Sequence, residues 1–239
     1  KGMLSLADHV TAKGLQASGG SITYHSLGQT IENSTGFSDV SGRMDGGKIS
    51  LNAEQGVMSS GTYLAAGATG KGGMIDLTGY GVRLLSATLD ASGMTQGGLI
   101  RGGGAFQGGK NLGIRGDNGE LLQSYVGRWS GVTDISNAQR TLVNDSSVLK
   151  VSATSGEGGT AIVWSDLQTT MAGEILASGV RGGVVEISSA GELRKAALDQ
   201  VVGSRHILLD PKNIVIGTTE QIGSWTYSAI IGAGYSGAA

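Results

Sequence analysis

The sequence has no cysteine and only one proline, Pro211, in 239 residues. Without cysteine the chain cannot carry a disulfide framework or a thiolate metal site. Proline cannot donate a hydrogen bond to a β-ladder, so we expect Pro211 at a corner between strands rather than inside one. The absence of cysteine therefore excludes the class of small proteins held together by disulfides.

Basic residues and long apolar runs are scarce as well. The 17 lysine and arginine residues stand against 19 acidic residues, which gives a net charge of −2, and they never form a run of five. We therefore expect no nucleic-acid partner. No window approaches about 18 consecutive apolar residues, and the N-terminus lacks the apolar core of a signal peptide. The sequence predicts no membrane-spanning helix, and if the protein is exported, this chain is a processed or excised piece of it.

Glycine, in contrast, is abundant, with 44 residues. The glycines follow no Gly-X-Y period, which excludes collagen. The hydrophobic fraction of 39% is too high for a disordered chain. A solenoid punctuated by glycine is the class of fold that remains.

Glycine pairs recur at 46–47, 72–73 and 97–98, with spacings of 26 and 25 residues. A repeat of this length is typical of solenoids, in which each unit buries its apolar face against its neighbours. The second and fourth residues after a pair are apolar, so the period of two predicts a strand with one buried face. We expect the glycines to supply turns and positive φ angles. The structural residues predicted in this way are Gly46, Gly47, Ile49, Leu51, Gly72, Gly73, Ile75, Leu77, Gly97 and Gly98.

Two further short runs follow each glycine pair, so each repeat holds three strands. Three short strands in about 25 residues predict an all-β fold, a parallel β-helix or β-solenoid of roughly eight or nine coils. Residues 1–103 contain the regular coils. The period fails after Gly103, so residues 104–145 form a coil with an insertion, and residues 146–239 continue the β-helix as a fragment of a longer chain.

Few side chains suit catalysis. The third position after each glycine pair points outward, which places Asp76 beside Arg101 on neighbouring coils. An exposed ion pair is the common outcome, and an acid–base pair of a sugar-cleaving β-helix is the alternative. No stacked column places two acids side by side, and His9, His25 and His206 fall in separate coils without metal-ligand spacing. We therefore expect no catalytic residue, no metal site and no cofactor.

The aromatic residues suggest where recognition occurs. Tyr125, Arg128 and Trp129 lie close together in the predicted insertion, a combination that suits sugar stacking or a protein contact. The alternative is that Trp129 caps the hydrophobic core beneath the insertion. We expect Trp164 to pack under the insertion in a structural role.

Four motifs follow one another in the second half of the chain: Gly-Gly-Thr-Ala-Ile-Val-Trp-Ser-Asp at 158–166, Thr-x-x-x-Gly-x-Ile-x-Ala at 169–177, Gly-Gly-Val-Val-Glu-Ile-Ser at 182–188 and Leu-Leu-Asp-Pro-Lys-Asn-Ile at 208–214. In this order they resemble the filamentous-haemagglutinin-like large exoproteins of two-partner secretion. With weaker matches at 102–108 and 137–143, the resemblance covers about residues 97 to 216. In that family an unfolded chain crosses the outer membrane of a Gram-negative cell through a β-barrel partner and folds outside as a right-handed parallel β-helix.

The resemblance implies a structural or binding segment of a secreted, surface-exposed adhesin or filament. Its expected partners are a glycan or protein of a host or neighbouring cell, or a matrix polysaccharide, and, for the parent protein, an outer-membrane β-barrel transporter. Self-association into filaments stays open, as do two alternative functions: a carbohydrate-active β-helix enzyme, either lyase or glycosidase, and the stalk of a contact-dependent toxin-delivery protein. The family's N-terminal secretion domain with its Asn-Pro motifs is absent, so we expect this segment not to engage the transporter itself.

Overall fold

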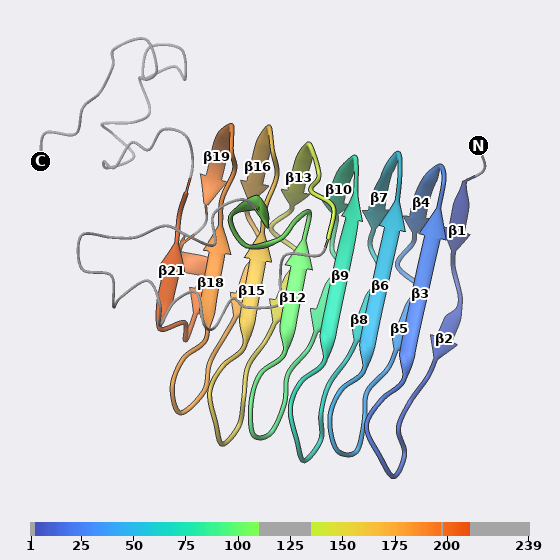
Figure 1. Cartoon of the computed structure of the whole chain (residues 1–239), viewed down its shortest axis with the longest axis vertical. Helices are drawn as coiled ribbons and strands as arrows, with labels where there is room; N and C mark the ends of the chain where they lie inside the picture. The colour runs from blue at the N-terminus through green and yellow to red at the C-terminus, as the bar shows by residue number, and fades with distance from the viewer. Residues whose placement is uncertain (1–2, 110–134, 197, 211–239) are drawn as a thin grey trace, which may run out of the picture.

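The computed structural model describes residues 3–109, 135–196 and 198–210, and these residues form a solenoid (Figure 1). Each turn gives one strand to each of three sheets, and each sheet holds seven strands that pair in parallel from one turn to the next. Successive turns place Ile49 beside Ile75 and Ile75 beside Ile100. The predicted all-β parallel solenoid is therefore confirmed, with seven turns in the part of the chain that the structure describes.

The strands of each sheet follow one another along the axis. The first sheet contains β1 (Leu4–Leu6), β4 (Gln29–Glu32), β7 (Gly56–Ser59), β10 (Gly81–Leu84), β13 (Arg140–Val143), β16 (Gln168–Met171) and β19 (Glu192–Ala196). The second contains β2 (His9–Thr11), β5 (Phe37–Asp39), β8 (Thr62–Leu64), β11 (Thr88–Asp90), β14 (Val148–Lys150), β17 (Glu174–Leu176) and β20 (Val201–Val202). The third contains β3 (Ser21–Ser26), β6 (Lys48–Ala53), β9 (Met74–Gly79), β12 (Leu99–Gly102), β15 (Thr160–Val163), β18 (Val184–Ile187) and β21 (His206–Leu208).

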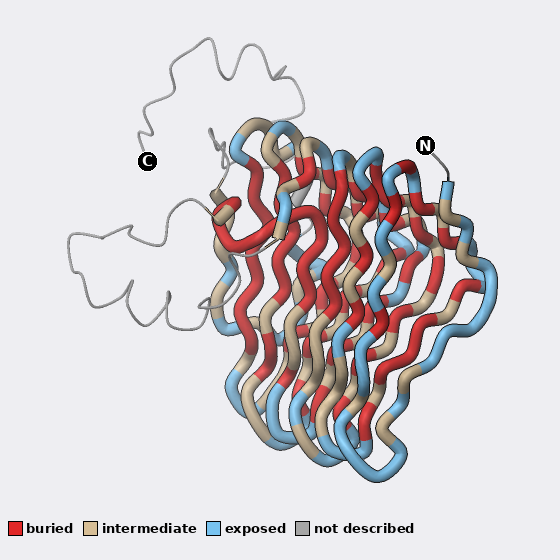
Figure 2. Tube along the Cα trace, turned by 45° about the vertical axis from the view of Figure 1, so that its right-hand side comes forward, coloured by how far each residue is buried: buried red, intermediate tan, exposed pale blue. Residues whose placement is uncertain are grey.

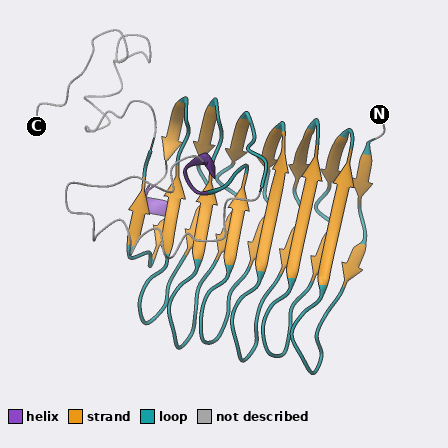
Figure 3. Cartoon of the chain, in the orientation of Figure 1, coloured by secondary structure: helices purple, strands orange, loops and turns teal. Residues whose placement is uncertain are grey.

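Helical structure is limited to two short 3-10 segments among the described residues, η1 (Phe106–Gly109) and η2 (Leu198–Gln200). Nowhere in the described ranges is there a helix of the length and apolar character needed to cross a membrane. The long loops that join the second sheet to the third stack on one another along one side (Figure 3).

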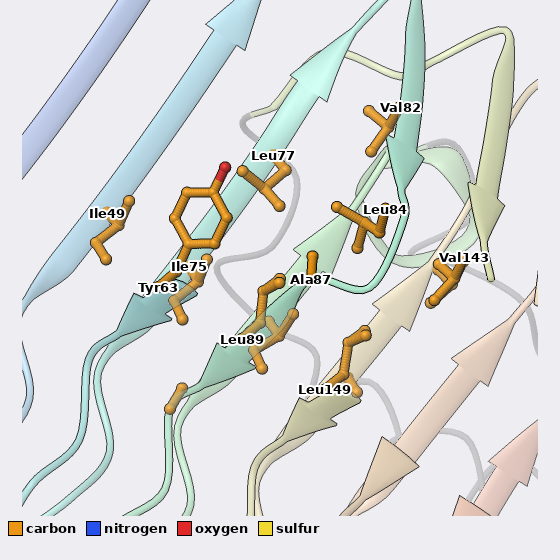
Figure 4. Close-up of a cluster of buried hydrophobic side chains, with 14 of the residues drawn as sticks. Ile49, Tyr63, Ile75, Leu77, Val82, Leu84, Ala87, Leu89, Val143 and Leu149 are labelled. Carbon is orange, nitrogen blue, oxygen red and sulfur yellow. The ribbon is translucent and has the colours of Figure 1, made fainter. Parts of the chain in front are cut away.

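The core follows from the alternation of apolar residues along each strand. In β6, Ile49 and Leu51 are buried while Lys48, Ser50 and Asn52 are not, because successive side chains in a strand point to opposite faces. Like residues stack from turn to turn, so the interior is a set of continuous aliphatic columns (Figure 4). Burial runs along the strands and exposure concentrates in the connecting loops (Figure 2). Tyr63, which is completely buried, also belongs to this core.

The glycine pairs are required by the close approach of neighbouring turns. A Cβ atom on Gly73 would lie 2.0 Å from the carbonyl oxygen of Gly47, and one on Gly98 would lie 2.1 Å from that of Gly73. The Gly73 amide also donates to the carbonyl of Ala65 at 2.7 Å, which closes the loop of its own turn. The expectation that the pairs at 46–47, 72–73 and 97–98 supply positive φ angles is wrong, since none of the six glycines has one.

The solenoid resumes before the end of the predicted insertion. The amide of Ala138 donates to the carbonyl of Gly103 at 2.6 Å, and that of Gln139 donates to the carbonyl of Tyr80 at 2.8 Å. From there β13 pairs with β10 in an unbroken parallel register. The departure from the regular turn is thus confined to the chain between Gly103 and Ala138, of which residues 110–134 lie outside the described ranges.

Candidate functional site

A short segment, residues 103–109, crosses the outward face of the third sheet, and we call it the strap (Figure 1). Phe106 packs there with Ile162, Trp164 and Val184 to form a second apolar cluster outside the solenoid core. The strap lies so close to the Trp164 ring that a Cβ atom on Gly104 would be 2.5 Å from Cδ1 of that ring. Trp164 therefore packs beneath the described start of the insertion.

Three polar residues from later turns hold the strap in place. The backbone amide of Gln107 lies 3.1 Å from both carboxyl oxygens of Glu186, and its side-chain Nε2 donates to Oδ2 of Asp210 at 3.2 Å. Asn137 Nδ2 donates to the Gly108 carbonyl at 2.9 Å. Gln107 has φ of 47°, in the left-handed region that a non-glycine residue enters at a cost, so these contacts offset local backbone strain. The strap is thus a fixed part of the surface.

The pKa of the Glu186 carboxyl group is raised well above its usual value. This pKa is raised to about 8, mainly by burial and to a smaller extent by the neighbouring Asp210 carboxylate, while hydrogen bonds from Gln107 and Ser188 act in the opposite direction. Removing a carboxylate from water disfavours its charged form, which is the main cause of the shift. The group is therefore largely protonated at neutral pH, and the strap covers a neutral carboxyl group.

The prediction of an exposed ion pair between Asp76 and Arg101 is wrong. They lie side by side on β9 and β12, as the repeat implied, but the pair is buried rather than exposed: Arg101 is 1% and Asp76 3% accessible. Arg101 Nε lies 2.6 Å from Oδ1 and Nη2 2.8 Å from Oδ2 of the carboxylate, and Nη2 also lies 3.8 Å from the Met74 sulfur. The row continues to Ile162, so this outward face is part of a covered apolar layer and not a solvated surface.

The acids of this face are poorly placed for glycoside cleavage. Asp76 and Glu186 share one row but stand three strands apart, which is ~14 Å at ~4.8 Å per strand. Glycosidases need carboxyl groups about 5 to 10 Å apart in an open cleft. Glu186 and Asp210 are closer to each other, but Gln107 contacts both and Glu186 is completely buried. Substrate could not reach the Glu186 carboxyl group while the strap is in place.

A shallow groove of about 720 Å³ runs along the glycine pairs, between the stacked loops and the third sheet. Its floor is backbone, and its polar side chains include Lys48, Lys71, Gln96 and Glu157. Glu157 is engaged by Arg181 at 2.7 Å. No aromatic ring occurs among the described residues that line it, so the groove offers hydrogen-bonding backbone but no stacking surface for a sugar.

The remaining predicted residues fall into two groups. Tyr125, Arg128 and Trp129, the candidate binding residues, and Pro211 lie outside the described residues. The expectation that the three histidines fall in separate coils is wrong for His9 and His25, which lie on β2 and β3 of the first turn but in different sheets, while His206 lies on β21 of the last turn. Nowhere in the described ranges do three or more His, Asp or Glu side chains gather as a metal site would need.

The Gln107, Glu186 and Asp210 cluster was not predicted from the sequence. Gln107 is separated by 79 residues from Glu186 and by 103 from Asp210. The repeat predicts which residues stack within a sheet. It does not predict where a segment outside the repeat, such as the strap, packs on the solenoid. One indirect sign was available, since Glu186 is an acid within the otherwise apolar run Val184–Ile187.

The chain is similar to a protein of known structure. No family model matches the chain, and no curated protein matches it. The chain is similar to the crystal structure of the HMW1 secretion domain from Haemophilus influenzae, with 26% identity and a TM-score of 0.48 over 79% of this chain and 49% of that chain. The chain thus spans about half the length of that domain. Because the TM-score is below 0.5, the similarity carries no functional argument and assigns the chain to no family.

Proposed function

We propose that this chain is a rigid structural and binding segment of a secreted, surface-exposed adhesin or filament of the filamentous-haemagglutinin-like, two-partner-secretion family. The observation that carries the proposal is the unbroken parallel stacking of seven turns around aliphatic columns. The ordered motifs between residues 97 and 216 are the support for the family.

The solenoid suits a spacer. Each inner strand hydrogen-bonds to the strands of both adjacent turns, so bending the rod would break ladders in all three sheets. Seven turns span about 30 Å at ~4.8 Å per turn. Further turns of the same kind would extend the rod and hold a recognition surface away from the cell.

The same stacking would help export. In our proposal the parent protein crosses the outer membrane unfolded through a β-barrel transporter, and each turn that folds outside is held by the turn before it. A folded turn could not slide back, so folding would give the transport a direction. The expected partners outside are a cell-surface glycan or protein, or a matrix polysaccharide.

A non-catalytic role is part of the proposal. The two most buried acids of the third sheet are already engaged, Asp76 by Arg101 and Glu186 by Gln107. Such engagement supports a structural use of these charges, because a general acid or base must reach its substrate.

The proposal is tested by incubating the purified 239-residue chain with a panel of neutral and acidic glycans. Saturable binding without release of reducing ends is the expected result. Release of reducing ends, or of unsaturated products absorbing in the ultraviolet, would instead establish a carbohydrate-active enzyme and overturn the proposal.

A further inference from the structure

A second concave surface lies on the outward face of the first sheet, away from the strap. It is a hollow of about 400 Å³ over β4, β7, β10, β13 and β16, and Arg194 of β19 lines its far end. Its floor is the outward row that reads Gln29, Gly56, Gly81 and Arg140 on successive strands. Two neighbouring glycines in one row leave this part of the face without side chains, and the flanking residues enclose the space. This volume falls within the usual range for small-ligand sites, about 300–1,000 Å³.

Gly81 is not required by the fold. A Cβ atom there would meet only the Arg140 carbonyl oxygen within 4 Å, at 3.8 Å, an ordinary contact, and Gly81 does not have a positive φ. Gly56 differs, since its φ is 134° and a Cβ atom would lie 2.8 Å from the Gly81 carbonyl oxygen. A strand glycine without a structural requirement often marks a place where another molecule approaches the backbone.

Three arginines line the hollow, Arg83, Arg140 and Arg194, and the last of these is paired with Glu192. Arg83 and Arg140 lie on adjacent strands, offset by two residues, so their backbones are roughly 8 Å apart and both side chains can reach one ligand. Neither makes an ion pair or a side-chain hydrogen bond with any described residue. No carboxylate lines the hollow, and nearby Glu192 is already bound by Arg194 at 3.0 Å and Gln168 at 2.6 Å.

Side chains that can contact a sugar ring and its hydroxyl groups line the hollow beside these arginines. Tyr80, which is 63% exposed, borders the hollow and presents a ring on which the apolar face of a pyranose can stack. The amides of Gln29 and Gln55 also line it and can bond to hydroxyl groups. An arginine fork matches the planar geometry of a carboxylate in a two-point contact.

We propose that this hollow binds a carboxylate-bearing sugar unit, a uronate, of a surface or matrix glycan. The inference rests on the proposed function and names the ligand class for it. Two guanidinium groups suit a sparse charge of about one per sugar, whereas a densely sulfated polymer would need a longer basic strip than this chain, with a net charge of −2, presents.

The test uses oligogalacturonate as the probe and calorimetry at fixed salt as the measurement. The 239-residue chain should bind it, and the methyl-esterified oligomer, which has lost its carboxylates, should not bind. Replacing both arginines, Arg83→Gln with Arg140→Gln, should weaken binding at least tenfold. The matched control Arg43→Gln with Arg205→Gln removes the same charge from exposed turn residues and should change affinity less than twofold.

Gly81→Val tests the hollow without changing charge. Valine favours strands and fits the open position, so thermal unfolding should stay at the wild-type temperature while oligogalacturonate binding falls at least tenfold. Wild-type affinity in both the double-arginine and the valine variants, equal losses in the control, or preference for a sulfated oligomer would overturn the inference. If those variants still bind other glycans of the panel, the proposed function stands and only the ligand assignment fails.

Discussion

The Asp76 carboxylate and the Arg101 guanidinium form a two-point ion pair across β9 and β12, with N–O distances of 2.6 and 2.8 Å, although both side chains point away from the solenoid core. Side-chain accessibilities of 4% and 2% show that this outward face is covered. The pair belongs to the same row as Ile162 and Glu186, and so this part of the surface behaves as interior.

Breaking this pair should be costly. Asp76→Ala breaks a buried two-point ion pair by removing the carboxylate that Arg101 contacts at 2.6 and 2.8 Å, and we expect a loss of about 3–5 kcal/mol in the free energy of unfolding. Urea denaturation followed by circular dichroism measures it.

The matched control is Lys150→Met, which breaks the half-exposed pair with Asp90 on the second sheet, at 3.2 Å. That variant should lose less than about 1 kcal/mol. Similar small losses in both variants would mean that the Asp76 pair is solvated after all.

The pKa of Glu186 makes stability depend on pH. The carboxyl has a pKa of about 8 when folded and 4.5 when unfolded. Below pH 4.5 both states hold the proton. Between 4.5 and 8 only the folded state keeps it, so stability falls as the pH rises through this window and falls no further above it.

Glu186→Gln keeps an acceptor for the Gln107 amide and removes the titration. We expect a shallower fall in the unfolding midpoint between pH 5 and 8 than in the wild-type chain. Some slope should remain, because burial also raises the pKa of Glu32. An identical slope in the two proteins would contradict the assignment of Glu186.

Two glycines offer a paired test of the turn packing. Gly73→Ala would place a Cβ atom 2.0 Å from the Gly47 carbonyl oxygen, so the turns must separate there and stability should fall by about 1–3 kcal/mol or more. Gly81→Ala meets only the Arg140 carbonyl oxygen at 3.8 Å and should be neutral or slightly stabilising. Chemical denaturation of both variants gives the comparison, and equal losses would argue against turn packing as the reason for the glycine pairs.

Ile75 tests the assignment of the core. It is completely inaccessible and stacks between Ile49 and Ile100. Ile75→Asp places a charge in an aliphatic column, which should cost several kcal/mol. Thermal unfolding measures the loss, and an unchanged midpoint would show that residue 75 does not face the interior.

Much of the fold could be predicted from the sequence because it depends on local periodicity. The alternation around Ile49 and Ile75 identifies the buried face, and the interval between glycine pairs sets which residues stack. The burial of Asp76 and Arg101 could not be predicted in this way. An outward residue in a repeat is exposed only if nothing crosses that face, and the repeat itself carries no signal for what crosses it.

The strap contacts are long-range. Gln107 meets Glu186 and Asp210 because the chain turns back over β15 and β18, a path that no local pattern specifies. The hollow beside Arg83 and Arg140 is similar in this respect. Its residues come from several strands, among them β7, β10 and β13, and the sequence alone does not show which of their residues lie side by side.

Attachment of the folded chain to cell surfaces tests the central claim most directly. Beads coated with the 239-residue chain should attach to host or neighbouring bacterial cells in a saturable way. Beads coated with Ile75→Asp, whose turns are disrupted, should lose that attachment. Equal attachment of the two, or none by the wild-type chain, would contradict the proposal that the solenoid is the binding rod of an adhesin.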